Sequence, residues 1–175
     1  MQRQYLFIWT IILVLLLIAC SSQKVGVYDD LDKQKMDKSF DKYMGTPYKW
    51  GGTEPGRGVD CSGFTSGVYR DQGIIIPRTS QMQYAVGDEV ARDEIQYGDL
   101  LFFDTLGKGV SHVGVYTEGN KMIHASSATG VTEVPMSTDY WMKRYIGARR
   151  LTGSDLASGE VGGEFHLLAK AYPIR

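Results

Sequence analysis

The stretch Gly58-Val59-Asp60-Cys61-Ser62-Gly63-Phe64 holds one of the two cysteines of this 175-residue chain. Asp60 is a residue type that often caps the first turn of a helix, because its carboxylate accepts hydrogen bonds from the free backbone N–H groups there. The residues that follow fit a helix closed by Gly73, a glycine suited to the left-handed position after a helix. We therefore predict a helix that begins at Cys61. A structural cysteine usually has apolar neighbours, whereas this one stands among polar residues and glycines.

Two glycines of this predicted helix, Gly63 and Gly67, are four residues apart and therefore fall on one face. A face without side chains favours close packing against another backbone. Before this helix, residues 31–44 carry apolar side chains on one helical face and predict another helix, whereas residues 48–58 are dense in glycine and indicate a loop. After it, residues 79–87 fit a short helix.

From Gly98 onward the pattern changes to short apolar runs separated by glycine and asparagine turns. Such runs predict strands joined by tight turns. Because helices come first and strands follow, the sequence predicts an α+β domain with an antiparallel sheet. The predicted strands cover residues 98–104, 112–117, 121–127 and 145–151.

The overall composition limits the functional classes. The formal net charge of −1 argues against a dominant nucleic-acid-binding surface, which needs a strongly basic face. The length is sufficient for one domain with its own hydrophobic core. We therefore expect one globular domain that does not bind nucleic acid.

The other cysteine, Cys20, ends an N-terminal segment that resembles a bacterial lipoprotein signal. Arg3 gives a basic start, and residues 5–18 form an apolar run that is short for a membrane span but suits the core of a signal peptide. Residues 17–20, Leu-Ile-Ala-Cys, resemble the lipobox, whose cysteine carries lipid and becomes the first residue after cleavage. The alternative is an uncleaved membrane anchor with an incidental cysteine.

The lipobox resemblance implies a signal peptide at residues 1–19 and a lipidated tether at residues 20–30. In a Gram-negative bacterium Ser21, in place of an aspartate, favours the outer membrane, with the protein facing the periplasm. Cys61 would then have no intramolecular partner in an oxidising compartment, where an unused thiol is a liability. This reasoning points to a chemical role for Cys61.

Two of the three histidines, His112 and His124, lie on neighbouring predicted strands. A three-residue loop at 117–119 would place them directly opposite each other, and a loop at 118–120 would leave them diagonal on the same face. A two-residue loop would put them on opposite faces. Two of these three connections therefore make the rings neighbours, and we expect both rings to point toward the helix that begins at Cys61. The third histidine, His166, is interpreted as a tail residue.

A cysteine in the first turn of a helix experiences the partial positive charge of the N-terminal amides, which lowers the thiol pKa and favours the thiolate. A nearby imidazole can shuttle the proton, and a second polar group can hold that imidazole in the right orientation. Cys61, His112 and His124 supply these three parts. On residue type alone, structural roles are the alternative. A zinc site is disfavoured, because these residues lack the paired short spacings of structural zinc sites.

Several sequence blocks together resemble the NlpC family of bacterial cell-wall cysteine peptidases, which have a papain-like fold. The resemblance covers about residues 38–151, and it implies a papain-like α+β peptidase domain at residues 31–152 followed by a tail at residues 153–175. The blocks are TPYKWGG, GVDCSGFTSGVY, IPRTSQMQ, YGDLLFFD, SHVGVYTEGNKMIHAS and YIGARRL.

The family resemblance also implies roles for single residues. Cys61 matches the nucleophile, His112 the general base, and His124 the polar residue that orients the base. Tyr48 matches a tyrosine that helps to position the substrate or the oxyanion. Asp60 matches an acidic residue that in some members contacts a substrate amine, in addition to capping the helix.

The segment after the nucleophile helix contributes two further candidates. Arg78 and Ser80 lie in a loop expected to line the cleft, with a structural role as the alternative, and Thr79 or Ser80 is expected to cap the next helix. No metal or cofactor is expected.

The sequence therefore predicts an outer-membrane lipoprotein that hydrolyses amide bonds in peptidoglycan stem peptides. The first choice of bond is the cross-link between D-alanine and diaminopimelate, because the chain resembles short lipoproteins of Gram-negative bacteria that cut this bond. The resemblance also implies that members acting on free stem peptides often use a wall-binding domain to close one end of the cleft, and the segment before Tyr48 is too short for such a domain. The bond between D-glutamate and diaminopimelate is the second choice. A non-catalytic peptidoglycan-binding lipoprotein and an acyl- or amide-transferase with the same three residues are the alternative functions.

Overall fold

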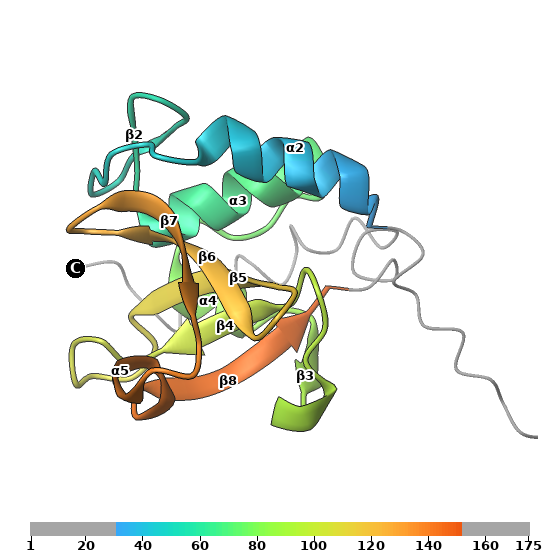
Figure 1. Cartoon of the computed structure of the whole chain (residues 1–175), viewed down its shortest axis with the longest axis vertical. Coiled ribbons are helices and arrows are strands. Elements are labelled where there is room, and N and C mark those ends of the chain that lie inside the picture. Colours follow the sequence, from blue (N-terminus) through green and yellow to red (C-terminus); the bar gives the residue numbers. More distant parts are fainter. Residues whose placement is uncertain (1–30, 152–175) are drawn as a thin grey trace, which may run out of the picture.

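The computed structural model describes residues 31–151, so the predicted signal peptide, tether and tail lie outside the described residues. The described part is an α+β fold, as predicted, with helices packed on a six-stranded sheet whose strand order is β3-β8-β4-β5-β6-β7 (Figure 1). The elements in chain order are α2 (Lys33–Tyr43), β1 (Thr53–Glu54), β2 (Gly58–Val59), α3 (Cys61–Asp71), α4 (Ser80–Tyr84), β3 (Asp88–Val90), the 3₁₀ turn η2 (Arg92–Glu94), β4 (Leu100–Phe103), β5 (His112–Thr117), β6 (Lys121–Ser126), β7 (Gly130–Pro135), α5 (Asp139–Met142) and β8 (Tyr145–Arg150).

Both ends of α3 follow from its sequence. The carboxylate of Asp60 accepts the backbone N–H of Gly63 at 2.7 Å, which caps the first turn. At the other end Gly73 has a φ of +92°, and its N–H donates to the carbonyl of Arg70 at 2.9 Å. A side chain at this left-handed position would be strained, so glycine ends the helix here. The predicted helix and both of its ends are confirmed.

The glycine face of α3 allows the close approach that the sequence indicated. A Cβ atom on Gly67 would lie 2.0 Å from the hydroxyl oxygen of Tyr43 on α2. A Cβ atom on Gly63 would lie 2.1 Å from the carbonyl oxygen of Gly52 in the loop before α3. No methyl group fits at either distance, so these two glycines set how closely α3 packs against α2 and against that loop.

Both faces of the sheet are buried, and β4 is apolar throughout for this reason. Leu100 and Phe102 of β4 pack with α2 and α3, whereas Leu101 and Phe103 pack on the opposite face with Trp141 of α5. Accordingly, α2 and α3 lie together on one side of the sheet, and α5 lies away from them beside the start of β8 (Figure 1). The first face includes Cys61 in its core, and the second face carries the two histidines.

Several short elements were not predicted. The loop before α3 contains the two-residue strands β1 and β2, which pair with each other. The edge strand β7 pairs with β6 over its full length, yet only Gly130 and Val131 of β7 are buried. Its sequence therefore lacks the apolar pattern from which a strand is predicted. The elements β3, η2 and α5 are too short to give a periodic pattern. Between residues 31 and 151, no helix has the length and apolar character needed to cross a membrane.

Candidate active site

The β5–β6 hairpin sets the relation between the two histidines. Thr117 pairs with Lys121, so the loop consists of residues 118–120, and His124 lies opposite Gly114. The directly opposite arrangement is therefore wrong, and the diagonal arrangement on one face is the one that forms. Asn120 ends the loop with a φ of 58°, a left-handed conformation that asparagine tolerates better than most side chains.

The glycine opposite His124 leaves space for the two rings to meet. A Cβ atom on Gly114 would lie 3.2 Å from the Cβ of His124 and 3.0 Å from the carbonyl oxygen of Ile123. With glycine in place, the Nε2 atom of His112 lies 2.9 Å from the Nδ1 atom of His124. One of these nitrogens must donate and the other must accept, so the two rings share one hydrogen bond.

Trp141 holds both imidazoles from the side away from α3. Its ring stacks on His112 with centroids 5.5 Å apart and an interplanar angle of 23°. The same ring meets His124 edge to face at 5.0 Å. The two rings share one sheet face, as expected, and this is the face that also carries Phe103, opposite the face on which α3 packs. Alternation along β5 explains this, because Val113 and not His112 faces the helix.

Cys61 is the first residue of α3 and is only 7% exposed. The pairing of β5 with β6 starts at Gly114, one residue after Val113. The backbone N–H of Val113 lies beside the Cys61 sulfur, where it acts to lower the thiol pKa. The start of α3 therefore lies against the start of β5, at the end of the hairpin where β5 is no longer paired with β6. The Cys61 thiol lies beside Val113, the residue that follows His112.

The pKa of the Cys61 thiol is raised, contrary to the sequence prediction. Burial is the main cause, and the negative charge of Asp60 adds to it. The backbone N–H groups of Val113, Ser62 and Cys61 act in the opposite direction but are outweighed. Cys61 is therefore a thiol, and not a thiolate, at neutral pH.

Both imidazoles are neutral at neutral pH. Burial, with a smaller contribution from His124, lowers the pKa of His112 to about 3, and burial lowers the pKa of His124 to about 4. Because the shared hydrogen bond uses Nε2 of His112, its Nδ1 atom is the ring nitrogen left for another proton. If Nε2 of His112 donates to His124, that Nδ1 atom carries a lone pair and can act as a base.

Tyr48 packs against the core cluster that includes Cys61. An isolated bridge to Val59 holds its backbone beside the start of α3. Burial raises the pKa of the Tyr48 phenol, and the negative charges of Asp60 and, at high pH where its thiol ionises, of Cys61 raise it further. The phenol therefore keeps its proton and can donate a hydrogen bond, and its role beside the nucleophile stays a prediction.

Asp60, the residue before Cys61, forms a bidentate ion pair with Arg78. The Nη1 and Nη2 atoms of Arg78 donate to the two carboxylate oxygens of Asp60 at 2.9 and 2.7 Å. Gly51 also donates its backbone N–H to this carboxylate, at 2.8 Å. Burial alone would raise the pKa of Asp60, but the bonds from Arg78 and the backbone hold that pKa below its usual range. Arg78 thus fixes the helix cap, and both oxygens of Asp60 already have partners.

Ser80 is not part of this network. Thr79 is the cap of α4, since its hydroxyl accepts the N–H of Met82 at 3.3 Å, and Ser80 is the buried first residue of that helix. The hydroxyl of Ser80 lies 3.4 Å from the side-chain oxygen of Gln81. Of the two predicted loop residues, the structure brings Arg78, and not Ser80, to Asp60.

A buried glutamine, Gln83, was missed by the sequence analysis. Its amide nitrogen donates to the carbonyl of Ser62 at 3.1 Å and to that of Pro77 at 2.8 Å, and its oxygen accepts from Thr65 at 2.8 Å. It therefore ties α4 to the first turn of α3. Nothing local distinguishes Gln83 from an exposed helical glutamine, because its partners come from other segments.

Between residues 31 and 151, no group of three or more His, Cys, Asp or Glu side chains is placed to hold a metal ion. A thiol at the start of a helix and a hydrogen-bonded pair of histidines on a covered antiparallel sheet define a papain-like α+β domain. Residues 45–150 match the model of the NlpC/P60 family, and the chain belongs to that family.

The chain is similar to several characterised members. It is 41% identical over 139 residues to the murein DD-endopeptidase MepH of Escherichia coli, a match that covers 72% of this chain and 51% of MepH. It is 41% identical over 112 residues to the gamma-DL-glutamyl hydrolase of Bacillus subtilis, covering 63% of this chain and 27% of the relative. The crystal structure of an NlpC/P60 family protein from Bacillus cereus superimposes with a TM-score of 0.63 at 39% identity, covering 69% of this chain and 40% of that chain. This chain thus spans about half the length of these proteins, or less.

Proposed function

We propose that this protein is a cysteine peptidase that hydrolyses amide bonds in peptidoglycan stem peptides, with the cross-link between D-alanine and diaminopimelate as its target. The observation that carries the proposal is the 2.9 Å hydrogen bond between His112 and His124 at the end of the hairpin where Cys61 meets Val113. The name of the relative MepH, a murein DD-endopeptidase, supports both the substrate and the bond.

The first chemical step is acylation. As the sulfur of Cys61 attacks the carbonyl carbon, the thiol proton moves to Nδ1 of His112 and an S–C bond forms. The imidazolium that results donates through Nε2 to the lone pair on Nδ1 of His124, which stabilises the new positive charge and keeps the ring in place. His112 then gives the proton to the leaving amine as the C–N bond breaks, and a thioester remains on Cys61.

Deacylation reverses the proton path. A water molecule loses a proton to Nδ1 of His112 and attacks the thioester carbonyl. The C–S bond breaks, the peptide leaves as a carboxylic acid, and the proton returns to Cys61. His112 therefore acts as base in the first half of each step and as acid in the second half.

Charge on the carbonyl oxygen needs donors near the sulfur. The backbone N–H groups of Cys61 and Ser62 in the first turn of α3 lie beside the thiol. The phenol of Tyr48 is protonated, and its backbone bridges to Val59, two residues before Cys61. We assign these groups to the oxyanion.

The raised thiol pKa requires that proton transfer accompany attack. Both partners are neutral before the substrate binds, so His112 must take the proton as the S–C bond forms. This differs from a mechanism with a preformed thiolate, and it makes the base essential.

The bond between D-glutamate and diaminopimelate is the second candidate. The name of the Bacillus subtilis relative, a gamma-DL-glutamyl hydrolase, favours it, although that match covers 27% of the relative.

We also propose that Cys20 carries lipid and anchors the protein to the outer membrane, facing the periplasm. The support is the lipobox-like sequence at residues 17–20, which lies outside the described residues. Mass spectrometry of Cys20 in the native host tests this part of the proposal, and an unmodified cysteine would refute it.

The activity is tested with purified muropeptides. The protein should convert cross-linked dimers to intact monomers, whereas shortened stems released from monomers would favour the second candidate. Cys61→Ala and His112→Ala should each remove more than about 99.9% of the turnover, because members of a catalytic unit fail together. Cys61→Ala should leave the fold intact, since the change removes one small side chain. Wild-type turnover in the Cys61→Ala protein would refute the mechanism.

A further inference from the structure

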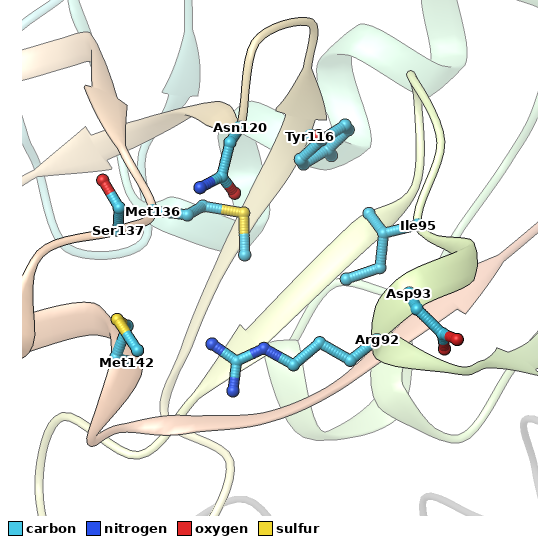
Figure 2. A pocket seen from close by; sticks show the side chains of 8 residues that line it. All are labelled: Arg92, Asp93, Ile95, Tyr116, Asn120, Met136, Ser137 and Met142. Carbon is cyan, nitrogen blue, oxygen red and sulfur yellow. The ribbon is translucent and has the colours of Figure 1, made fainter.

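A pocket of about 420 Å³ opens on the sheet face that carries the two histidines (Figure 2). Its volume is within the range of small-ligand sites. Apolar walls come from four residues of separate segments: Ile95 after η2, Tyr116 on β5, Met136 after β7 and Met142 on α5. The mechanism proposed above uses none of these residues.

The polar groups of this pocket are mostly hydrogen-bond donors. The guanidinium of Arg92 points into the space between the apolar walls, and the side-chain amide of Asn120 is directed toward the same space (Figure 2). The carboxylate of Asp93, the acidic residue of the lining, points away from Arg92 (Figure 2). The pocket therefore presents the guanidinium of Arg92, while the carboxylate of Asp93 is turned away from that guanidinium.

Arg92 has no carboxylate partner among residues 31–151. Its contact within the domain is with the ring of Tyr145, whose centroid lies 5.1 Å from the guanidinium carbon. By comparison, Arg78 and Arg150 each pair with a buried aspartate, at 2.7 and 2.9 Å. The carbonyl of Asn120 accepts the N–H of Met136 at 2.9 Å, which fixes the turn and leaves the side-chain amide available.

The pocket adjoins the candidate active site through two elements. Tyr116 lies on the same face of β5 as His112 and four residues further on, which is about 13 Å along an extended strand. Met142 directly follows Trp141, whose ring contacts both histidines. An extended peptide of about four residues spans this separation. One end of a peptide that passes His112 can therefore occupy the pocket.

We propose that this pocket binds a free carboxylate of the peptide substrate. Arg92 holds the carboxylate through two parallel N–H bonds, Asn120 donates a third, and the methionines pack against the adjoining aliphatic chain. Stem peptides carry such groups on D-glutamate, on diaminopimelate and at the C-terminus. The inference rests on the proposed function for the identity of the peptide, and it makes Arg92 a determinant of substrate specificity outside the catalytic residues.

Binding is measured by isothermal titration calorimetry with the Cys61→Ala form of the full chain, which prevents turnover and is the parent protein for the other changes. The probe is a stem tetrapeptide of L-alanine, D-glutamate, diaminopimelate and D-alanine, compared with the same peptide whose carboxylates are converted to amides. Arg92→Gln should weaken binding of the free acid roughly tenfold, and Arg92→Lys by less, because lysine keeps the charge but loses the fork. Arg70→Gln is the matched control, since Arg70 is an exposed arginine of α3 that does not line the pocket.

The amidated peptide should bind the parent protein and the Arg92→Gln protein equally weakly. Equal affinity of the free acid for these two proteins would overturn the inference, as would equal affinity of the parent protein for the acid and the amide. Cleavage by the protein that retains Cys61 is assayed separately. Peptide binding that depends on Arg92, without any cleavage, would refute the proposed function and leave the pocket assignment standing. Cleavage together with peptide binding that does not depend on Arg92 would support the proposed function and refute the pocket assignment.

Discussion

His124 lies directly across the hairpin from Gly114, and the missing side chain at Gly114 is what allows the ring of His124 to reach His112. A methyl group there would lie 3.2 Å from the Cβ of His124, closer than most real contacts of this kind. The hydrogen bond between the two histidines therefore depends on a residue that has no side chain.

Gly114→Ala should push β6 away and lengthen the bond between the two imidazoles. We expect kcat to fall by roughly tenfold or more, because a misplaced base loses proton-transfer efficiency. Gly147→Ala is the control, since a Cβ atom there would also meet a neighbour at 3.0 Å, the hydroxyl of Tyr84, but away from the histidines. Steady-state kinetics on cross-linked dimers checks this, and equal losses in the two variants would contradict it.

Arg78→Gln should destabilise the fold by about 1 kcal/mol, because the buried carboxylate of Asp60 loses two bonds while the arginine itself is 40% exposed and partly screened by solvent. Arg57→Gln removes an ion pair whose two members are both well exposed, and it should change little. Urea unfolding of the two variants gives the comparison. A larger loss in the Arg57 variant would show that burial of Asp60 is not the source of the effect.

Acid should weaken the fold through the histidines. The folded pKa of His124 is about 4, below the unfolded value near 6.5, so the unfolded chain binds more protons between these pH values. Stability is therefore complete above pH 6.5 and falls as the pH decreases toward 4. Between pH 7 and pH 5 the loss due to His124 should be about 2 kcal/mol. Urea unfolding at both pH values should show a smaller loss in His124→Gln; identical losses would show that His124 does not titrate this way.

The thiol should react slowly at neutral pH. Because burial and Asp60 raise the pKa of Cys61, its alkylation by iodoacetamide should accelerate continuously from pH 7 to beyond pH 9. Cys20→Ser leaves Cys61 as the single cysteine of the chain, so the rate reports on one site. A rate that is already at its plateau below pH 7 would indicate a preformed thiolate and would contradict the neutral-pair mechanism.

Local signals in the sequence were sufficient for much of the fold. Asp60 and Gly73 delimit α3 because caps act on their immediate neighbours, and the glycine face of α3 predicted its close packing. The hairpin loop could not be chosen among its alternatives, because three-residue loops that differ by one residue all satisfy the same turn chemistry. The edge strand β7 was missed because its exposed side chains give little apolar pattern.

The site was less accessible to sequence reasoning, because its properties depend on packing. Helix position alone predicts a lowered thiol pKa at Cys61, but the burial that reverses this direction comes from segments distant in the chain. The contact of Trp141 with both imidazoles and the role of Gln83 in joining α4 to α3 also have no local signal.

The last strand of the described domain, β8, lies inside the sheet between β3 and β4. A chain that is still being synthesised therefore cannot complete the sheet from its earlier strands, since the gap between β3 and β4 is filled by the final segment. Folding must wait for contacts between distant parts of the sequence, which slows it relative to a fold built from local contacts. Cys61 is synthesised well before Trp141 and β8. During synthesis the chain therefore carries its thiol before Trp141 can pack against His112 and His124. The candidate active site is assembled only when the domain is nearly complete.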